Sequence, residues 1–273
     1  MKLADRIALL SALGKSIQSD IDSGRIKDIL EGAYATNPWF VEKFTQTALQ
    51  QIVDQYLDPQ ALEAWAGAYS FVGQNKTIAL IPAGNIPLVG IHDIISIIVS
   101  GHRARVKPSS KDKVLTNYVI NSLYELDPVS REMLEAVDRL EGFDAVIATG
   151  SNNTNRYFEH YFSKYPNLLR KNRTSVALVD ENTSTEELKL LGHDVFNYFG
   201  LGCRSVSKIY MPENFNVEAM LDEWKDFEWV GEHTKYHNNY MYQKSVYLVN
   251  KVSHFDTGFV LLNETNEMFS PIG

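Results

Sequence analysis

The sequence predicts an α/β fold in which helices cover both faces of a parallel β-sheet. From residue 77 onward, short β-branched runs are each followed by a polar or glycine-containing loop and then by a helical stretch, and this order is typical of parallel sheets. The chain has 273 residues, of which 44% are hydrophobic and 22% charged. A chain of this size and composition buries a sizeable core, in one large domain or in two smaller ones.

The residues before the first strand predict a helical N-terminal extension. Apolar residues such as Leu3, Ile7 and Leu10 recur at the three- and four-residue spacing of an amphipathic helix. Pro59 marks a turn between two of these helices. We therefore expect residues 1–70 to form a helical layer that packs on the domain that follows.

Repeated strand, loop and helix patterns follow this extension. The four strand-like runs comprise residues 77–85, 102–110, 143–151 and 174–182. We expect residues 71–200 to form a cofactor-binding domain and residues 201–273 to form the first part of a second, catalytic α/β domain. Because that second domain would lack a complete core, the sequence indicates either a truncated chain or one that a partner completes.

The charge and cysteine content argue against several classes of protein. With 26 basic and 34 acidic residues the net charge is −8, so nucleic acid is not an expected partner. The single cysteine, Cys203, cannot form an intramolecular disulfide, which favours a reducing compartment. The N-terminus has no signal-peptide cleavage site, and the longest apolar segment, residues 86–101, is shorter than the roughly 20 residues that a membrane span needs. We therefore expect a cytoplasmic protein without a membrane span.

Two loops at the ends of predicted strands are candidate ligand sites. Gly84 and Asn85 follow the first strand, and Gly150 and Ser151 follow the third. At such strand ends, loop amides and helix N-termini point toward anions. The alternative is that both are ordinary turns, because every fold of this type contains them. The nearest match to a dinucleotide fingerprint, at residues 200–205, lacks the third glycine and follows a helical pattern.

Cys203 is a candidate nucleophile. Nearby glycines allow a ligand to approach the backbone, and the adjacent Arg204 favours the thiolate. The alternative is a buried cysteine that acts as a small hydrophobic residue. His233 and His237 are four residues apart, but no third ligand is evident, so we expect a solvated surface there and no metal site.

Six segments of the sequence occur in an order typical of one superfamily. They are IPAGNIP at 81–87, RVKPSS at 105–110, ATGS at 148–151, LLRKNRTSVALV at 168–179, GLGC at 200–203 and EMFSP at 267–271. Together they resemble the aldehyde dehydrogenase superfamily and, within it, the LuxC-type acyl-CoA reductases, the fatty acid reductases of bacterial luminescence. The resemblance extends from residue 77 to residue 273, and it implies an aldehyde-dehydrogenase-like fold with a cofactor domain and a thiol-bearing catalytic domain.

The resemblance implies roles for individual residues. Cys203 would attack the thioester carbonyl, while the Asn85 side chain and the Cys203 backbone N–H would stabilise the oxyanion. The residues implied to bind the cofactor are Lys107 at the adenosine ribose, Ser109, Ser110 and Lys111 in the loop that follows it, Gly150 and Ser151 at the pyrophosphate, and Glu267 and Phe269 at the nicotinamide riboside.

Two departures from the hydrolytic members of the superfamily indicate the reaction and the cofactor. Residues 169–173 carry no carboxylate where those enzymes have a water-activating glutamate, so the acyl-enzyme would be protected from water and could accept hydride. Ser110 stands where an acidic residue would bind the ribose 2′-hydroxyl, and Lys111 follows it. An ammonium in place of a carboxylate favours a 2′-phosphate, so we expect NADPH to be preferred, with NAD as the alternative cofactor.

We therefore predict NADPH-dependent reduction of a long-chain fatty acyl-CoA or acyl-protein thioester to the aldehyde, through an acyl-Cys203 intermediate. One alternative is a CoA-acylating aldehyde dehydrogenase that works in the oxidative direction, and another is a catalytically silent acyl-binding or scaffold protein. The resemblance also implies two kinds of protein partner, an acyl-activating enzyme and further copies of the chain in a dimer or tetramer.

Overall fold

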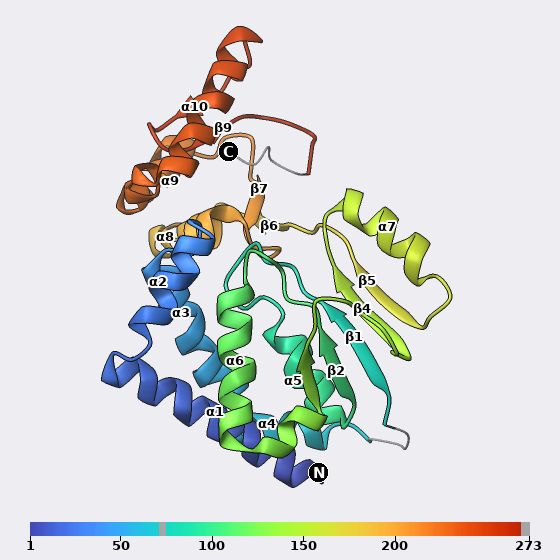
Figure 1. The fold of residues 1–273 in the computed structure, drawn as a ribbon. Coiled ribbons are helices and arrows are strands. Elements are labelled where there is room, and N and C mark those ends of the chain that lie inside the picture. The colour runs from blue at the N-terminus through green and yellow to red at the C-terminus, as the bar shows by residue number, and fades with distance from the viewer. Residues whose placement is uncertain (71–74, 269–273) are drawn as a thin grey trace. The chain divides into compact units, whose positions relative to one another are not determined.

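The computed structural model describes residues 1–70 and 75–268. The chain divides into two compact units, Met1–Asn172 and Arg173–Gly273 (Figure 1). This division falls between two strands, whereas the sequence predicted domain boundaries after residues 70 and 200.

Within residues 1–70 the chain forms four α-helices. They are α1 (Leu3–Ser23), α2 (Lys27–Thr36), α3 (Glu42–Gln51) and α4 (Pro59–Gly67), with a π-helical turn at Ile52–Tyr56 between α3 and α4. The α4 helix begins at Pro59 because the side chain of Asp58 accepts a hydrogen bond from the Ala61 N–H at 2.8 Å. Leu10 and Leu13 of α1 are fully buried, so this helix contributes directly to the core of the first unit.

The described part of the first unit contains a sheet of five parallel strands. In chain order they are β1 (Thr77–Ile81), β2 (Arg103–Val106), β3 (Leu134–Ala136), β4 (Ala145–Thr149) and β5 (Asn167–Arg170). Their spatial order is β3-β2-β1-β4-β5, so the chain moves from β1 to one edge of the sheet and then to the other. The sequence located β1, β2 and β4 but missed β3 and β5, which contain no β-branched residue.

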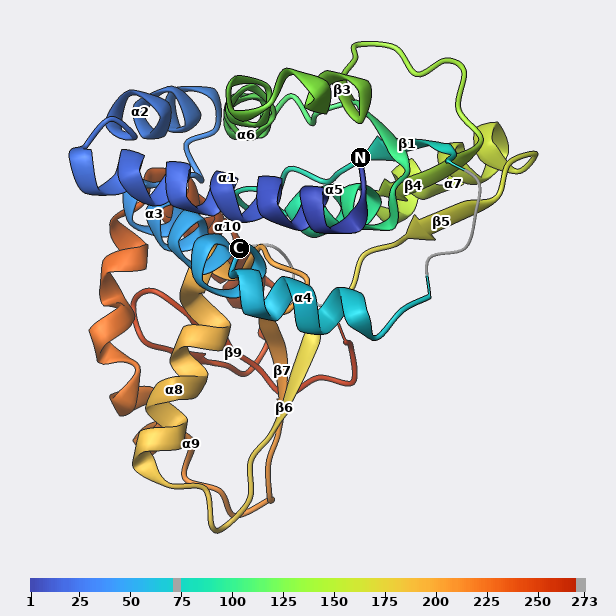
Figure 2. The ribbon, with the colours of Figure 1, turned by 90° about the horizontal axis from the view of Figure 1, so that it is seen from below.

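Helices cover both faces of this sheet. The helices α5 (Ile91–Ser100) and α6 (Lys113–Leu126) follow β1 and β2, and α7 (Asn152–Phe162) follows β4. Ile78 and Leu80 of β1 belong to the large core that α1, α5 and α6 share, and Figure 2 shows α1 lying along α5. Ala79 faces the opposite side, where it packs with Val146 of β4 and Phe158 of α7. This alternation is typical of a strand buried on both faces, and it confirms the predicted fold class.

The described part of the second unit begins with a separate pair of parallel strands, β6 (Ser175–Leu178) and β7 (Val206–Tyr210). The prediction that the run at residues 174–182 continues the first sheet was therefore wrong. Its local sequence correctly indicated a strand. This strand pairs with β7, which lies later in the chain and which the repeat pattern did not reveal.

The rest of the described second unit is mainly helical. It comprises α8 (Thr185–Phe196), α9 (Val217–Glu223), α10 (Thr234–Val249) and the short antiparallel strands β8 (Phe255–Asp256) and β9 (Leu261–Leu262). Phe196 and Trp224 are buried edge to face, and the Trp224 Nε1 donates to the Leu188 carbonyl at 2.9 Å. Lys244 and Tyr240 of α10 both bind the Asp256 carboxylate, so these side chains tie α10 to β8.

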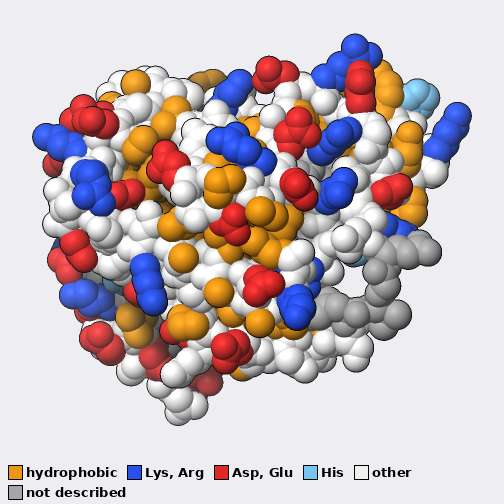
Figure 3. All heavy atoms as spheres, turned by 60° about the horizontal axis from the view of Figure 1, so that its bottom comes forward, with side chains coloured by type: hydrophobic (Ala, Val, Ile, Leu, Met, Phe, Trp, Pro, Cys, Tyr) orange, Lys and Arg blue, Asp and Glu red, His pale blue; other side chains and the backbone are white. Residues whose placement is uncertain are grey.

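The surface carries charges of both signs. Acidic and basic side chains are interspersed over the face shown in Figure 3, with small apolar areas between them. Scattered apolar surface of this kind is usual for a folded domain. Within residues 1–70 and 75–268, no helix is both long enough and apolar enough to cross a bilayer.

Candidate active site

Three loops of the first unit meet at the carboxyl edge of its sheet. The strands β2, β1 and β4 are neighbours in the sheet, with Leu80 paired to Val106 and Ile81 paired to Ala148. Because the strands are parallel, the loops that follow them emerge on the same edge. The structure therefore places residues 82–90, residues 107–112 and the Gly150–Ser151 turn at the same edge of the sheet.

The loops that follow β1 and β2 are packed against each other. A Cβ atom on Gly84 would lie 2.6 Å from the Ser109 Cβ, so only glycine fits at this position without displacing the neighbouring loop. The Lys107 N–H donates to the Leu80 carbonyl at 2.9 Å and extends the pairing of the two strands into the loops. Asn85 is half-buried and directly follows Gly84, so it lies next to the contact between the two loops.

The loop after β2 presents cations to solvent. Lys107, Ser110 and Lys111 are exposed, whereas Ser109 is half-buried and its Oγ accepts a hydrogen bond from the Lys111 N–H at 3.3 Å. Asp112 ends the loop, and its side chain is buried rather than exposed beside the lysines. The accessible part of this loop is therefore positively charged and carries a hydroxyl group, which suits a phosphate ligand.

The Gly150–Ser151 turn connects β4 to the N-terminus of α7. The Gly150 N–H donates to the Arg170 carbonyl at 3.1 Å, and the Ser151 Oγ accepts from the Thr154 N–H at 3.2 Å as the N-cap of α7. A Cβ on Gly150 would lie 3.0 Å from the Phe158 ring, so the turn packs tightly on its own helix. Ser151 is exposed at the positive end of the helix dipole, a position that favours an anionic ligand.

Sequence reasoning missed two buried carboxylates at this edge. Arg170, the last residue of β5, binds Asp93 in the first turn of α5 through two hydrogen bonds of 2.6 and 2.9 Å. Asp112 accepts a hydrogen bond from the Leu88 N–H at 3.0 Å, and burial raises the pKa of its carboxyl to about 8. No local signal reveals either residue, because each partner lies far away in the sequence.

Cys203 lies in the second unit, in an exposed turn that precedes β7. Gly200, with φ +70°, turns the chain into this segment. The Gly202 N–H donates to the Ser205 Oγ at 3.2 Å, and the Ser205 N–H donates back to the Gly202 carbonyl at 3.0 Å. These two bonds brace the turn on both sides of the cysteine. The alternative of a buried cysteine is therefore wrong, because this residue is exposed.

The segment that carries Glu267 is bound to the same strand, β7. Lys208 of β7 donates to the carbonyl oxygens of Thr265 at 2.7 Å and Glu267 at 3.0 Å. The Ser207 Oγ donates to the Met268 carbonyl at 3.1 Å. Glu267 itself is exposed. The structure thus brings the Cys203 turn and the Glu267 segment to one strand, while Phe269 lies outside the described residues.

The histidine pair of the sequence lies at the N-terminus of α10. His233 is the N-cap of α10, where its Nδ1 accepts from the Tyr236 N–H at 3.4 Å, and His237 is exposed one turn later. Throughout the described part of the chain, no three His, Cys, Asp or Glu side chains converge as metal ligands would.

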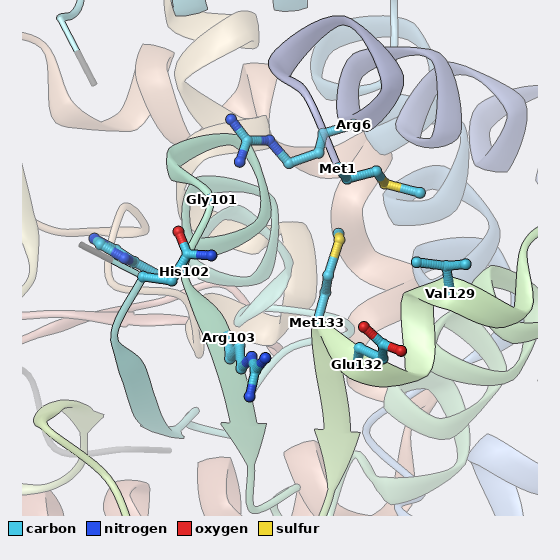
Figure 4. Close-up of a pocket in the computed structure, with 9 residues that line it drawn as sticks. Met1, Arg6, Gly101, His102, Arg103, Val129, Glu132 and Met133 are labelled. Carbon is cyan, nitrogen blue, oxygen red and sulfur yellow. The ribbon is translucent and has the colours of Figure 1, made fainter. Parts of the chain in front are cut away.

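A cavity of about 110 Å³ lies in the first unit at the amino-terminal end of β2, where Figure 4 shows Arg6, His102 and Met133 around it. Burial lowers the pKa of His102, and the neighbouring Lys76 and Arg6 add to this shift. The residues that line the cavity include none of the predicted site residues. The cavity is at the opposite end of β2 from the loop with Lys107, so it is separate from the candidate site.

Relatives with curated names are reductases of acyl thioesters. Long-chain acyl-protein thioester reductase 2 of Photobacterium leiognathi is 24% identical over 190 residues, which cover 64% of this chain and 38% of the relative. The long-chain acyl-protein thioester reductase of Photobacterium phosphoreum is 25% identical over 195 residues, which cover 66% of this chain and 38% of that protein. The chain therefore spans about two fifths of the length of these relatives.

Solved structures of aldehyde dehydrogenases share the fold. An aldehyde dehydrogenase of Bacillus cereus, solved as its NAD+ complex, matches with a TM-score of 0.68 and 14% identity over 93% of this chain and 59% of that one. A putative aldehyde dehydrogenase of Burkholderia cenocepacia matches with a TM-score of 0.67 and 14% identity, over 93% of this chain and 60% of that one. The fold is thus aldehyde-dehydrogenase-like, as the sequence predicted.

The family model described as Acyl-CoA reductase (LuxC) matches residues 40–223. The matched range contains Asn85, the loop after β2, the Gly150–Ser151 turn and Cys203, and it ends before Glu267. The match covers more than half of the sequence. The chain therefore belongs to the LuxC family of acyl-CoA reductases.

Proposed function

We propose that the protein reduces a long-chain fatty acyl thioester to the fatty aldehyde with NADPH, through an acyl group held on Cys203. The observation that carries this proposal is the exposed cysteine in a braced, glycine-flanked turn, in a chain that belongs to the LuxC family. An exposed thiol can be reached by the carbonyl of a thioester, whereas a thiol buried in a core could not.

The carboxyl edge of the first unit is suited to a dinucleotide. Gly84 packs closely on the neighbouring loop and Gly150 on α7, so both turns are held firmly where the strands end. Ser151 at the N-terminus of α7 would contact the pyrophosphate, and Lys107 the adenosine ribose. Glu267 and Phe269 remain the residues we propose for the nicotinamide riboside.

The preference for NADPH rests on the loop after β2. Ser110 and Lys111 are exposed, and the one carboxylate of residues 107–112, Asp112, is buried and therefore does not repel a phosphate at the surface. A ribose 2′-phosphate would be attracted by Lys111 and accept a hydrogen bond from the Ser110 hydroxyl. A free 2′-hydroxyl would find no exposed carboxylate in this loop to accept its hydrogen bond.

The proposed chemistry uses the thiol twice. The Cys203 thiolate attacks the thioester carbonyl, the oxyanion is stabilised by the Asn85 amide and the Cys203 N–H, and the carrier thiol leaves with a proton. The acyl carbon then receives a hydride, which NADPH supplies when bound. The resulting thiohemiacetal on Cys203 collapses to the aldehyde and regenerates the thiol.

A general base for hydrolysis is missing from the segment where hydrolytic relatives carry one. Residues 169–173 contain no carboxylate, and the carboxylate nearest to Arg170, that of Asp93, is buried with both oxygens bound to the guanidinium. Both oxygens of this carboxylate are thus occupied by the guanidinium. This arrangement favours hydride transfer over hydrolysis of the acyl-enzyme.

The acyl donor we propose is a protein-bound thioester, which an acyl-activating partner enzyme would deliver. Both relatives described above are named as acyl-protein thioester reductases, which supports this choice over free acyl-CoA. Acyl-CoA and an acylated carrier protein can be compared directly as substrates. A value of kcat/KM for the acyl-protein that is at least about tenfold higher would support the proposal.

Intact-protein mass spectrometry tests the central step. The protein is mixed with a long-chain acyl thioester, NADPH is then added, and the Cys203→Ala variant is treated in parallel. We expect an acyl adduct on the wild-type protein alone, which NADPH clears with release of aldehyde. An adduct that persists in NADPH would indicate an acyl acceptor instead of a reductase, and an equal adduct on Cys203→Ala would exclude the assigned nucleophile.

A further inference from the structure

Asp112 connects two of the loops at the carboxyl edge of the first unit. It stands between the exposed Lys111 and Lys113, yet the residue is only 3% exposed. Its Oδ2 accepts a hydrogen bond from the Leu88 N–H at 3.0 Å, and its Oδ1 is buried with no hydrogen-bond partner among the described residues. A polar group buried in this way is costly, so its position calls for an explanation.

The bond of Asp112 is made to another loop and not to its own helix. Asp112 occupies the N-cap position of α6 but makes no side-chain bond to an N–H of that helix. In contrast, Asp58, Ser151 and Ser184 each accept a hydrogen bond from the helix that they precede. Ordinary helix capping therefore does not account for Asp112.

The residue that Asp112 holds has an uncommon backbone conformation. Leu88 has φ +51°, in the left-handed region that bulky residues rarely adopt, and it is itself buried. The Leu88 carbonyl accepts from the Ile91 N–H at 2.9 Å and so begins the turn into α5. Leu88 lies three residues after Asn85, so the conformation at Leu88 fixes how the loop leaves the Asn85 position.

Together with the close packing of Gly84 on Ser109, the Asp112 bond holds the segment at both ends. We propose that Asp112 is a positioning residue that locks residues 84–88 against the loop after β2 and thereby orients the Asn85 amide. This inference rests on the function proposed for Asn85 as an oxyanion donor. Asp112 touches no reacting atom and acts only through the loop.

The proposal identifies a conservative replacement. With its pKa raised to about 8 by burial, the Asp112 carboxyl is mainly protonated at neutral pH. An asparagine amide has the same shape as a protonated carboxyl and keeps one acceptor oxygen for the Leu88 N–H. Asp112→Asn should therefore retain the positioning, whereas Asp112→Ala removes it.

The test measures single-turnover reduction of a long-chain acyl thioester by four variants. They are Asp112→Ala, Asp112→Asn, Asn85→Ala and the double variant Asp112→Ala/Asn85→Ala. We expect Asp112→Ala to lower the single-turnover rate by about tenfold or more, with the apparent Kd for NADPH changed less than about threefold, and Asp112→Asn to remain within about threefold of the wild-type rate. In the Asn85→Ala background, Asp112→Ala should have little further effect, because both changes act on the same group.

A matched control separates positioning from stability. Asp127 follows the other end of α6 and its side chain accepts from the Val129 N–H at 2.9 Å. Asp127→Ala should lower the melting temperature without lowering the rate of acyl reduction. Additive effects of Asp112→Ala and Asn85→Ala, or an equal loss of rate in Asp127→Ala, would overturn the proposal. If Asp112→Ala does not fold, Asp112→Ser takes its place, since the shorter hydroxyl leaves the Leu88 N–H without a partner.

Hydrogen exchange at the Leu88 amide tests the proposal without an activity assay. If the wild-type protein reduces no acyl thioester, the proposed function has failed, but exchange at the Leu88 amide still reports whether Asp112 holds the loop. We expect faster exchange at Leu88 in Asp112→Ala and near wild-type protection in Asp112→Asn. Unchanged protection in Asp112→Ala would show that Asp112 does not hold this segment.

Discussion

The ion pair between Asp93 and Arg170 predicts that Arg170→Ala strongly destabilises the protein. The guanidinium of Arg170 at the end of β5 bonds both oxygens of Asp93 in the first turn of α5, at 2.6 and 2.9 Å. The Asp93 side chain is 8% exposed and the Arg170 side chain 32% exposed. Removal of the arginine leaves a buried carboxylate without its counter-ion, and such a loss costs about 3–5 kcal/mol of unfolding free energy.

The partial exposure of Arg170 determines how much unfolding free energy Arg170→Ala costs within this range. Because Arg170 is about a third exposed, water can partly solvate Asp93 once the arginine is removed, so we expect the lower end of the range, about 3 kcal/mol. Asp93→Asn should cost less, about 1–2 kcal/mol, because the remaining guanidinium reaches solvent. The double variant Asp93→Asn/Arg170→Ala should lose less unfolding free energy than the two single variants together, by about 1 kcal/mol or more.

Urea unfolding followed by circular dichroism measures these differences. The matched control is Lys171→Ala, which breaks the exposed 2.9 Å pair between Lys171 and Glu159. We expect the control to change the unfolding free energy by less than about 1 kcal/mol. A loss below about 1 kcal/mol in Arg170→Ala, or strict additivity of the two single variants, would show that the buried pair does not contribute as its geometry indicates.

Three further predictions follow from the same edge of the sheet. The folded-state pKa of Asp112, about 8, lies above its ordinary value of 3.8, so its contribution to stability is complete below about pH 4 and is lost as the pH rises to about 8. As the pH rises from about 4 to about 8, the unfolding free energy of Asp112→Asn, measured in urea, should therefore increase relative to that of the wild-type protein, by up to about 4 kcal/mol at pH 7. A difference between the two proteins that does not change with pH would contradict the raised pKa. Gly84→Ala should lower the melting temperature and weaken NADPH binding in fluorescence titrations, because its Cβ collides with Ser109, whereas Gly67→Ala, in open space on α4, should do neither. Lys111→Glu should raise Kd for NADPH by about tenfold while changing Kd for NADH less than about threefold, and equal changes would argue against a 2′-phosphate contact at Lys111.

Local sequence patterns were sufficient for part of the fold only. The runs at β1, β2 and β4 contain β-branched residues and end in polar loops, so both the strands and their direction could be predicted. The strands β3 and β5 lie at the edges of the sheet and are short, and their residues have no strong strand preference. The pairing of β6 with β7 could not be predicted either, because strand propensity describes a single segment whereas pairing depends on two segments.

The same division holds for the candidate site. The turn at Gly150 and the candidate nucleophile Cys203 were named from local sequence, because glycine and cysteine carry their chemistry locally, whereas Lys107 was named through the family resemblance. The buried carboxylates could not be predicted, since Asp93 meets a partner 77 residues away and Asp112 one 24 residues away. Burial decides the charge state of a carboxyl, and burial is known only after the chain has folded.

These two carboxylates explain how an acidic chain can present a cationic edge. The net charge is −8, yet in the loops at 82–90, 107–112 and 150–151 Asp112 is the one carboxylate, and its raised pKa keeps it mainly uncharged at neutral pH. The charge of Asp93 is neutralised by Arg170. What remains at this edge is the ammonium groups of Lys107 and Lys111 and the N-termini of α5, α6 and α7, all of which begin after strands of the same sheet. Because aligned helix N-termini and cationic side chains attract phosphate, the local field at this edge would favour a polyphosphate ligand even though the net charge of the molecule would repel one.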